Sequence, residues 1–202
     1  MKIQRLNWDK DKHGLIWKIS DVFSEEELDY IKSKLPVQEI GKPPKAAAKR
    51  IDNLERLRRT WHSRLKDLYA QFKEEYKEEN IPILCPDYWN TQDVWTDMSL
   101  QGTARNLNYR IHADVVEKLL TFVVYVYPEI QEPTYFHEYN NEIVQKFKED
   151  DISPIRAVPW EINTGYMFIA NNKSLHSYSN MIYNTDRYIV IANLRRAVEN
   201  EV

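Results

Sequence analysis

The feature that most constrains this chain is a short polar motif, His112-Ala-Asp114, followed closely by an apolar run over residues 119–127. Side chains alternate between the two faces of a β-strand, so residues 112 and 114 of an extended chain lean the same way, roughly 6 to 7 Å apart along the backbone. One metal ion can bridge an imidazole and a carboxylate at this spacing. The motif therefore predicts a metal site in a β-rich core.

A third ligand has to come from elsewhere, and His176 is the best candidate among the later histidines. Two histidines and one carboxylate hold non-haem Fe(II) and leave coordination positions open for chemistry. A His-x-Asp pair alone is common by chance, and a surface or core histidine beside a carboxylate is the structural alternative. The context favours the metal site, because an apolar strand follows the motif and His176 lies beyond another.

Arg187 lies 11 residues beyond His176, near the start of a further apolar strand. If Ile189 and Ile191 face the core, period-two alternation sends Arg187 inward with them. A guanidinium that points inward keeps its charge and must meet an anion. That anion is either an Asp or Glu of this chain or the carboxylate of a ligand held by two hydrogen bonds, and the sequence leaves both open.

Thr121 and Tyr125 share one side of the apolar strand that follows the motif. If this side lines the cavity, their hydroxyl groups point at the same ligand as Arg187. An ordinary amphipathic strand is the alternative for both residues.

The rest of the chain reads as helices followed by short strands. Ser24 to Glu27 resemble a capping box that begins a helix ending near residue 35. Apolar residues at steps of three or four, from Ile51 to Tyr76, predict the longest helix, packed on the outside of a sheet. Strands are expected at residues 14–19, 94–100, 105–112, 119–127, 134–138, 155–158, 165–170 and 188–194, and residues 140–150 read as an insertion on the rim.

The segment 42–66 is locally basic, with nine Lys or Arg residues against two acids. Its one aromatic residue, Trp61, falls on the apolar stripe and not on the charged side, where it would be needed to stack a base. A solvated helix face is therefore favoured over a nucleic-acid or phosphate patch.

Composition excludes several other classes. The net charge of −3 gives no general reason to expect nucleic acid or a membrane as partner. Four glycines are too few for a glycine-rich phosphate loop or a dinucleotide fingerprint. The sequence shows neither a signal-peptide core nor a spanning segment, and the single cysteine, Cys85, fits a reducing compartment, so a cytoplasmic location is expected.

These residues resemble the 2-oxoglutarate and Fe(II)-dependent dioxygenases, in particular the prolyl-hydroxylase-like branch. The likeness rests on His112-x-Asp114, the strand ending at Tyr125, His176 and Arg187, and residues 17–28 are similar to the family's N-terminal strand and helix. Two departures are visible. Residues 132–136 replace a frequent Gly-Gly pair, and Ile189 stands where the family often has a serine.

The resemblance implies an α+β, mainly β chain with a double-stranded β-helix (jelly roll) core and N-terminal supporting helices. One domain is expected over residues 1–202, with the supporting elements in 1–80 and the core in 88–196. His112, Asp114 and His176 would bind iron, while Arg187 and Tyr125, with Thr121 nearby, would hold 2-oxoglutarate. Residues 88–95 and 134–150 would shape substrate entry, with Trp89, Trp95, Tyr135 and His137 as candidates to line it, although packing alone is favoured for any single one of them.

The implied activity is hydroxylation of a C–H bond in a peptidyl substrate, including a prolyl residue, or in a small molecule. Fe(II), 2-oxoglutarate, dioxygen and, as an auxiliary reductant, ascorbate are the expected cofactors, with succinate and carbon dioxide released. Three alternatives remain open: a cupin-like metal-binding protein without oxygenase activity, a zinc hydrolase, and a nucleic-acid demethylase of the same chemistry. No membrane partner is expected, and only the basic segment supports a nucleic acid.

Overall fold

The computed structural model describes residues 1–36, 49–84, 94–105, 107–138, 156–180, 182–183 and 185–196. The predicted insertion at 140–150, the entrance candidate Trp89 and the basic residues 42–48 lie outside these ranges. Within them, no helix is long and apolar enough to cross a membrane.

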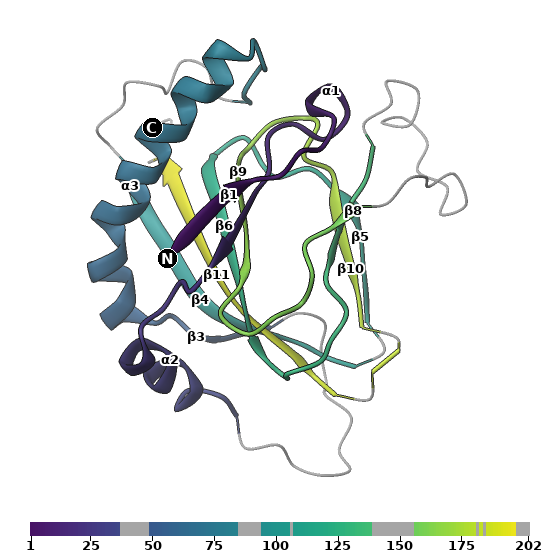
Figure 1. The fold of residues 1–202 in the computed structure, drawn as a ribbon. Helices are drawn as coiled ribbons and strands as arrows, with labels where there is room; N and C mark the ends of the chain where they lie inside the picture. Colours follow the sequence, from purple (N-terminus) through teal and green to yellow (C-terminus); the bar gives the residue numbers. More distant parts are fainter. Residues whose placement is uncertain are drawn as a thin grey trace, which may run out of the picture.

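Two antiparallel sheets face each other, and the longest helix lies against the outer side of the larger sheet (Figure 1). The larger sheet contains β1 (Lys2–Arg5), β2 (Trp17–Ser20), β3 (Lys49–Asp52), β4 (Val94–Thr103), β6 (Lys118–Tyr127), β9 (Gly165–Ile169) and β11 (Arg187–Arg196), in the order β1-β2-β9-β6-β11-β4-β3. The smaller sheet contains β5 (Asn108–His112), β7 (Thr134–Phe136), β8 (Arg156–Ala157) and β10 (His176–Ser179), in the order β5-β10-β7-β8. The helices are α1 (Lys10–His13), α2 (Glu25–Lys32) and α3 (Glu55–Glu78).

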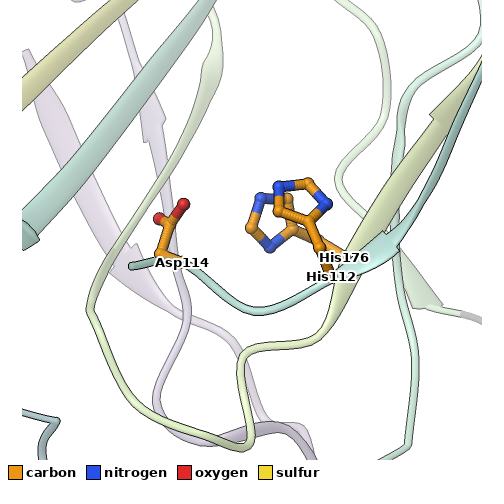
Figure 2. A group of neighbouring side chains, drawn as sticks. All are labelled: His112, Asp114 and His176. Carbon is orange, nitrogen blue, oxygen red and sulfur yellow. The ribbon is translucent and has the colours of Figure 1, made fainter. Parts of the chain in front are cut away.

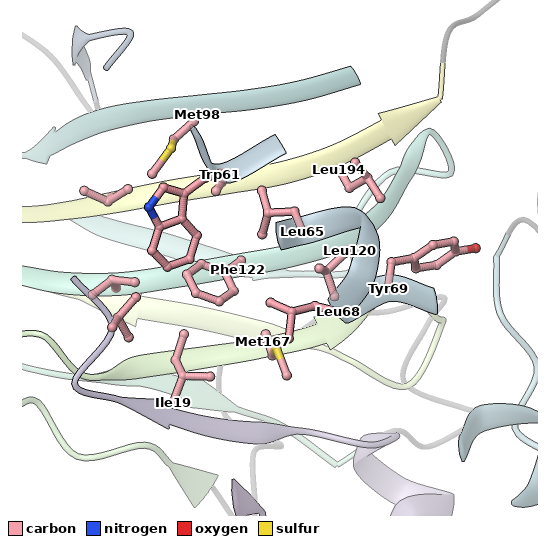
Figure 3. Packing of buried hydrophobic residues seen from close by; sticks show 14 of the residues in the cluster. Ile19, Trp61, Leu65, Leu68, Tyr69, Met98, Leu120, Phe122, Met167 and Leu194 are labelled. Carbon is pink, nitrogen blue, oxygen red and sulfur yellow. The ribbon is translucent and has the colours of Figure 1, made fainter. Parts of the chain in front are cut away.

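The predicted apolar stripe of the long helix is confirmed from Trp61 onward. The buried residues of α3 pack against the outer face of the larger sheet, where Trp61 lies close to Phe122 (Figure 3). The prediction was wrong at Ile51, which belongs to β3. Residue 54 adopts a left-handed conformation, and the Asp52 carboxylate accepts the N–H of Leu54, so the chain turns before the helix begins.

The capping box is also confirmed. The Ser24 hydroxyl accepts the Glu27 N–H, and the Glu27 side chain accepts the Ser24 N–H, which satisfies two backbone donors at the start of α2. The helix ends at Lys32, slightly before the predicted position.

Alternation along β6 and β11 divides the interior into two layers. Phe122 and Val124 face outward into the cluster under α3, whereas Val123 and Tyr125 face the smaller sheet. Ile189 and Ile191 also lie in this inner cluster, and Arg187 is wholly buried. The inward direction predicted for Arg187 from period-two alternation is therefore confirmed.

The predicted strands are found with shifted ends, but one strand that matters for function was missed. β10 is short and polar, so it shows no apolar alternation, and it forms because β5 and β7 pair with it on either side. The expectation that residues 112 and 114 share a strand was also wrong. β5 ends at His112, and Asp114 lies just beyond it, before a turn at residues 115–118.

Candidate metal centre

Three residues that the sequence analysis selected lie together between the two sheets. His112 and His176 are directly paired across β5 and β10, and their ring centroids are 4.3 Å apart. One ligand atom from each of His112, Asp114 and His176 lies within 4.8 Å of the others. Figure 2 shows the Asp114 carboxylate facing the two imidazole rings. The arrangement has the donor set of a site with two histidines and one carboxylate.

Backbone contacts fix the tautomer of both imidazoles. The Nδ1 atom of His112 lies 3.0 Å from the carbonyl oxygen of Arg110, and that of His176 lies 2.9 Å from the carbonyl oxygen of Ser174. A carbonyl only accepts, so each Nδ1 must carry a proton and donate it. Nε2 is then the nitrogen that can bind a metal, and the contact of Nδ1–H with a backbone carbonyl is the usual second contact of a metal-bound histidine.

Burial keeps His176 in its neutral form. Desolvation is the main cause that lowers the pKa of His176 to about 4, although the charge of Asp114 acts in the opposite direction. A neutral imidazole can donate its lone pair to a metal at neutral pH without first losing a proton.

The carboxylate of Asp114 is held from two sides. Lys118 donates to Oδ1 at 2.6 Å, and the hydroxyl of Thr121 donates a short hydrogen bond to Oδ2. Burial would raise the pKa of Asp114, but His176, Lys118 and these hydrogen bonds lower it below its usual value. Asp114 is therefore a charged and oriented acceptor.

Thr121 touches the candidate metal ligand and not the arginine. Its hydroxyl also lies 3.3 Å from the amide oxygen of Asn193. Contact between Thr121 and a cosubstrate stays a prediction, because in the structure this side chain orients Asp114.

Arg187 is a buried cation whose hydrogen bonds are incomplete. It is 0% exposed, and one terminal nitrogen donates to the hydroxyl of Thr134 at 2.8 Å. Its Nε and its other terminal nitrogen have no hydrogen-bond partner, and no carboxylate of the described part of the chain forms an ion pair with it. An unpaired buried guanidinium is costly, so its retention favours an anion that the described residues do not supply.

Aromatic rings form the walls around this guanidinium. Its carbon atom lies 4.4 Å from the ring centre of Tyr178, 5.2 Å from that of Trp160 and 5.8 Å from that of Tyr125. The Tyr125 ring stacks on Trp160, and the Tyr125 hydroxyl donates to the Val158 carbonyl at 3.3 Å. Tyr125 is thus beside Arg187, as predicted, but its hydroxyl proton is already used.

A run of stacked rings links the arginine to the metal-ligand candidates. Tyr178, against the guanidinium, stacks on Tyr109 at 5.1 Å, and Tyr109 meets the His112 ring edge-on at 4.8 Å. Tyr178 and Tyr109 therefore connect Arg187 with His112 through direct ring contacts.

Four residues of this site were not predicted from the sequence. Lys118 is four residues beyond Asp114, a spacing that could have suggested an ion pair. Tyr178 is two residues beyond His176, but β10 itself was not predicted. No sequence pattern indicated Thr134 or Trp160, because they contact Arg187 only when segments that are distant in the sequence come together.

The entrance candidates have different surroundings. Trp95 is 44% exposed and Tyr135 is half-buried. His137 is buried, and its Nε2 lies 2.7 Å from the Ser177 hydroxyl. His137 is therefore packed beside the smaller sheet, whereas Trp95 has an exposed surface.

Comparison with known proteins supports the fold through structure alone. No protein-family model matches the sequence, and no curated protein matches it. A prolyl-4-hydroxylase from Pseudomonas putida superposes with a TM-score of 0.56 at 11% identity, over 94% of this chain and 96% of that one. AviO1 from Streptomyces viridochromogenes gives 0.56 at 11% identity, over 94% and 92% of the two chains. HygX from Streptomyces hygroscopicus, with nickel and 2-oxoglutarate bound, gives 0.54 at 12% identity, over 93% and 85%.

These likenesses confirm the predicted fold class. The protein is mainly β, with two facing antiparallel sheets, and has the double-stranded β-helix fold of the 2-oxoglutarate oxygenases to which it is similar. Identities of 11–12% establish the fold, and the chemistry has to be argued from the site itself.

Proposed function

We propose that this protein is an Fe(II)- and 2-oxoglutarate-dependent dioxygenase that hydroxylates a C–H bond of a peptidyl or small-molecule substrate. A prolyl residue is one candidate for the oxidised group. The observation that carries this proposal is the pairing of a two-histidine, one-carboxylate cluster with a buried arginine that lacks an anionic partner in the described chain.

The residues fit the two groups that the proposal requires. His112 and His176, with free Nε2 atoms, and the ionised Asp114 would hold Fe(II). The guanidinium of Arg187, which has nitrogens without a hydrogen-bond partner in the described chain, would bind the distal carboxylate of 2-oxoglutarate. When bound, iron and the keto acid supply oxidation of a C–H bond by dioxygen, with release of succinate and carbon dioxide.

The chain's own side chains prepare the site before these groups arrive. Lys118 and Thr121 orient the Asp114 carboxylate, so little reorganisation is needed when a metal binds. The rings of Tyr125, Trp160 and Tyr178 exclude water from Arg187, which strengthens its attraction to a carboxylate. Thr134, which accepts a hydrogen bond from Arg187, is our candidate for a second contact to the same carboxylate.

The proposed substrate class is supported by similar solved structures. One similar structure is a prolyl-4-hydroxylase, and others hold hygromycin B or a nogalamycin compound. The activity of the first protein and the small molecules bound to the others support an oxygenase that acts on a peptide or on a small molecule. The cytoplasmic location stays a prediction that rests on the single cysteine.

The direct test is succinate formation from 2-oxoglutarate with Fe(II) and ascorbate, in the natural protein and in His112→Ala. We expect turnover of the keto acid in the natural protein and loss of at least 99% of it, about a hundredfold, in the variant. A protein that binds metal but neither binds nor consumes 2-oxoglutarate would instead be a cupin-like metal-binding protein.

The zinc alternative is separated by metal content. A protein purified without oxygen should carry iron, or regain activity with Fe(II). Hydrolytic activity restored by zinc alone would favour a hydrolase with the same three ligands.

A further inference from the structure

A second candidate site lies at the edge of the larger sheet, where β4 meets the start of α3. Two adjoining hollows there share Trp95 and Arg58, and Arg50, Arg59 and Arg195 also line them. We call them together the Trp95 hollow. In the described chain β3 pairs only with residues 100–102 of β4, so Trp95 lies where this edge strand is open.

The Trp95 hollow carries an excess of positive charge. Among the described residues that line it, four arginines share two carboxylates, those of Glu55 and Asp97. Glu55 contacts Arg58 and Arg59 at 2.6 and 3.3 Å. Asp97 contacts Arg50 and Arg195 at 2.8 and 3.5 Å. Each acid thus serves two guanidiniums, and the remaining charge of +2 favours an anionic ligand.

Trp95 adds an exposed aromatic surface among these charges. Its side chain is 44% exposed, and the Arg195 guanidinium lies 5.8 Å from its ring centre. An exposed ring flanked by arginines is the combination that holds a nucleotide, because the base stacks on the ring and the phosphate meets the cations. The basic helix itself offers no exposed aromatic ring, because its tryptophan, Trp61, faces the core. In the structure, Trp95 of β4 lies beside the arginines of this helix.

The sheet also connects the Trp95 hollow with the metal-ligand candidates. Trp95, Arg195 and Lys118 are register partners on three neighbouring strands. Lys118 in turn donates to Asp114. Two strand spacings separate the backbones of Trp95 and Lys118, which is about 10 Å. A chain of nucleotides held in the hollow therefore lies within reach of the candidate metal centre.

We propose that the Trp95 hollow binds a nucleotide unit, with the base on Trp95 and the phosphate among Arg50, Arg58 and Arg59. The unit comes either from a single-stranded nucleic acid or from a free nucleotide. Binding does not depend on the proposed oxygenase activity, so either proposal can fail without the other.

The test is fluorescence anisotropy with short labelled oligo-dT and oligo-U at several salt concentrations. Trp95→Ala should weaken binding about tenfold or more, whereas Trp95→Phe, which keeps an aromatic face, should largely retain it. Arg59→Ala should weaken binding and lower the salt dependence, because one phosphate contact is lost. Arg56→Ala is the matched control, since Arg56 is an exposed arginine of the same helix that pairs with Glu26 outside the hollow.

Competition identifies the source of the ligand. Displacement by AMP at equal affinity assigns the site to free nucleotides, and displacement only by oligonucleotides assigns it to a strand. Both results support the proposal. Binding that is equal in Trp95→Ala, Arg59→Ala and Arg56→Ala, or a phosphopeptide that displaces the probe regardless of Trp95, would overturn it.

The His112→Ala protein tests whether the Trp95 hollow and the candidate metal centre are separate sites. It should lose succinate formation while it binds the oligonucleotide as well as the natural protein does. Loss of oligonucleotide binding in this variant, with its fold retained by circular dichroism, would contradict a separate Trp95 hollow.

Discussion

The two faces of the larger sheet differ sharply in what they bury. On the outer face, Phe122 of β6 and Val190 of β11 pack with Trp61 of α3 in an apolar layer. On the inner face, the same two strands present Thr121 and Arg187, and the neighbouring turn presents Asp114. One residue along either strand separates a side chain that stabilises the fold from one that forms the site.

This difference shows how the fold compensates for buried charged groups on its inner face. The inner face contains an unpaired cation and a carboxylate, which lower stability unless ligands compensate them. The apolar layer under α3 provides burial that offsets such a cost. Substitutions on the outer face should therefore lower stability, whereas substitutions on the inner face should change binding and, where they remove an unpaired buried charge, raise stability.

Phe122→Ala should give the largest effect. Phe122 is 0% exposed and packs against Trp61, so its truncation leaves a cavity and should lower the free energy of unfolding by about 3–5 kcal/mol. Urea denaturation measures this loss. Metal affinity of the folded variant should be unchanged, and a loss below about 1 kcal/mol would mean that the outer layer is not the stabilising one.

Arg187→Met should raise the free energy of unfolding, whereas Phe122→Ala lowers it. The variant keeps much of the side-chain volume and removes an unpaired buried charge, so the ligand-free protein should become more stable by about 1–4 kcal/mol. Thermal and urea unfolding without 2-oxoglutarate test this. A clear destabilisation would indicate that Arg187 is compensated within the chain, as the cupin-like alternative requires.

Low pH should weaken the metal-free protein through His176. Its pKa is about 4 in the folded protein and roughly 6.5 in an unfolded chain, so the unfolded state binds more protons between these values. Stability should therefore fall as pH decreases from about 6.5 to about 4, by up to about 3 kcal/mol for this group. His176→Gln should flatten this part of the profile, measured by urea denaturation at each pH, and an unchanged slope would contradict the assignment.

Thr121→Val should produce the smallest change in stability but a clear change in binding. Loss of the hydroxyl that orients Asp114 should weaken Fe(II) binding by about 10–100-fold, measured by anaerobic calorimetry. Thr96→Val is the matched control. Thr96 is also a buried threonine of the larger sheet, but its hydroxyl contacts His62 on the α3 side. Equal affinity in both variants would remove Thr121 from the site.

Sequence predicted those parts of the structure that depend on local periodicity. The stripe of α3, the capping box of α2 and the inward side of Arg187 all follow from spacings of three to four or of two residues. β10 could not be predicted in this way, because His176-Ser-Tyr-Ser carries no apolar pattern and depends on β5 and β7 for its pairing.

The candidate site was only partly visible for the same reason. His112, Asp114 and His176 could be chosen by residue type and spacing, and the structure brings them together. The contacts of their neighbours depend on tertiary structure. Tyr125 uses its hydroxyl on the Val158 carbonyl, and Thr134 reaches Arg187 from another strand. No pattern within one segment encodes such contacts.

Calorimetric titration of 2-oxoglutarate into the Fe(II)-loaded protein without oxygen tests the central claim most directly. We expect binding in the natural protein, no measurable binding without metal, and at least about a hundredfold weaker binding in Arg187→Met, since charged hydrogen bonds to a buried carboxylate are lost. Equal affinity of the natural protein and Arg187→Met for 2-oxoglutarate would contradict the proposed site.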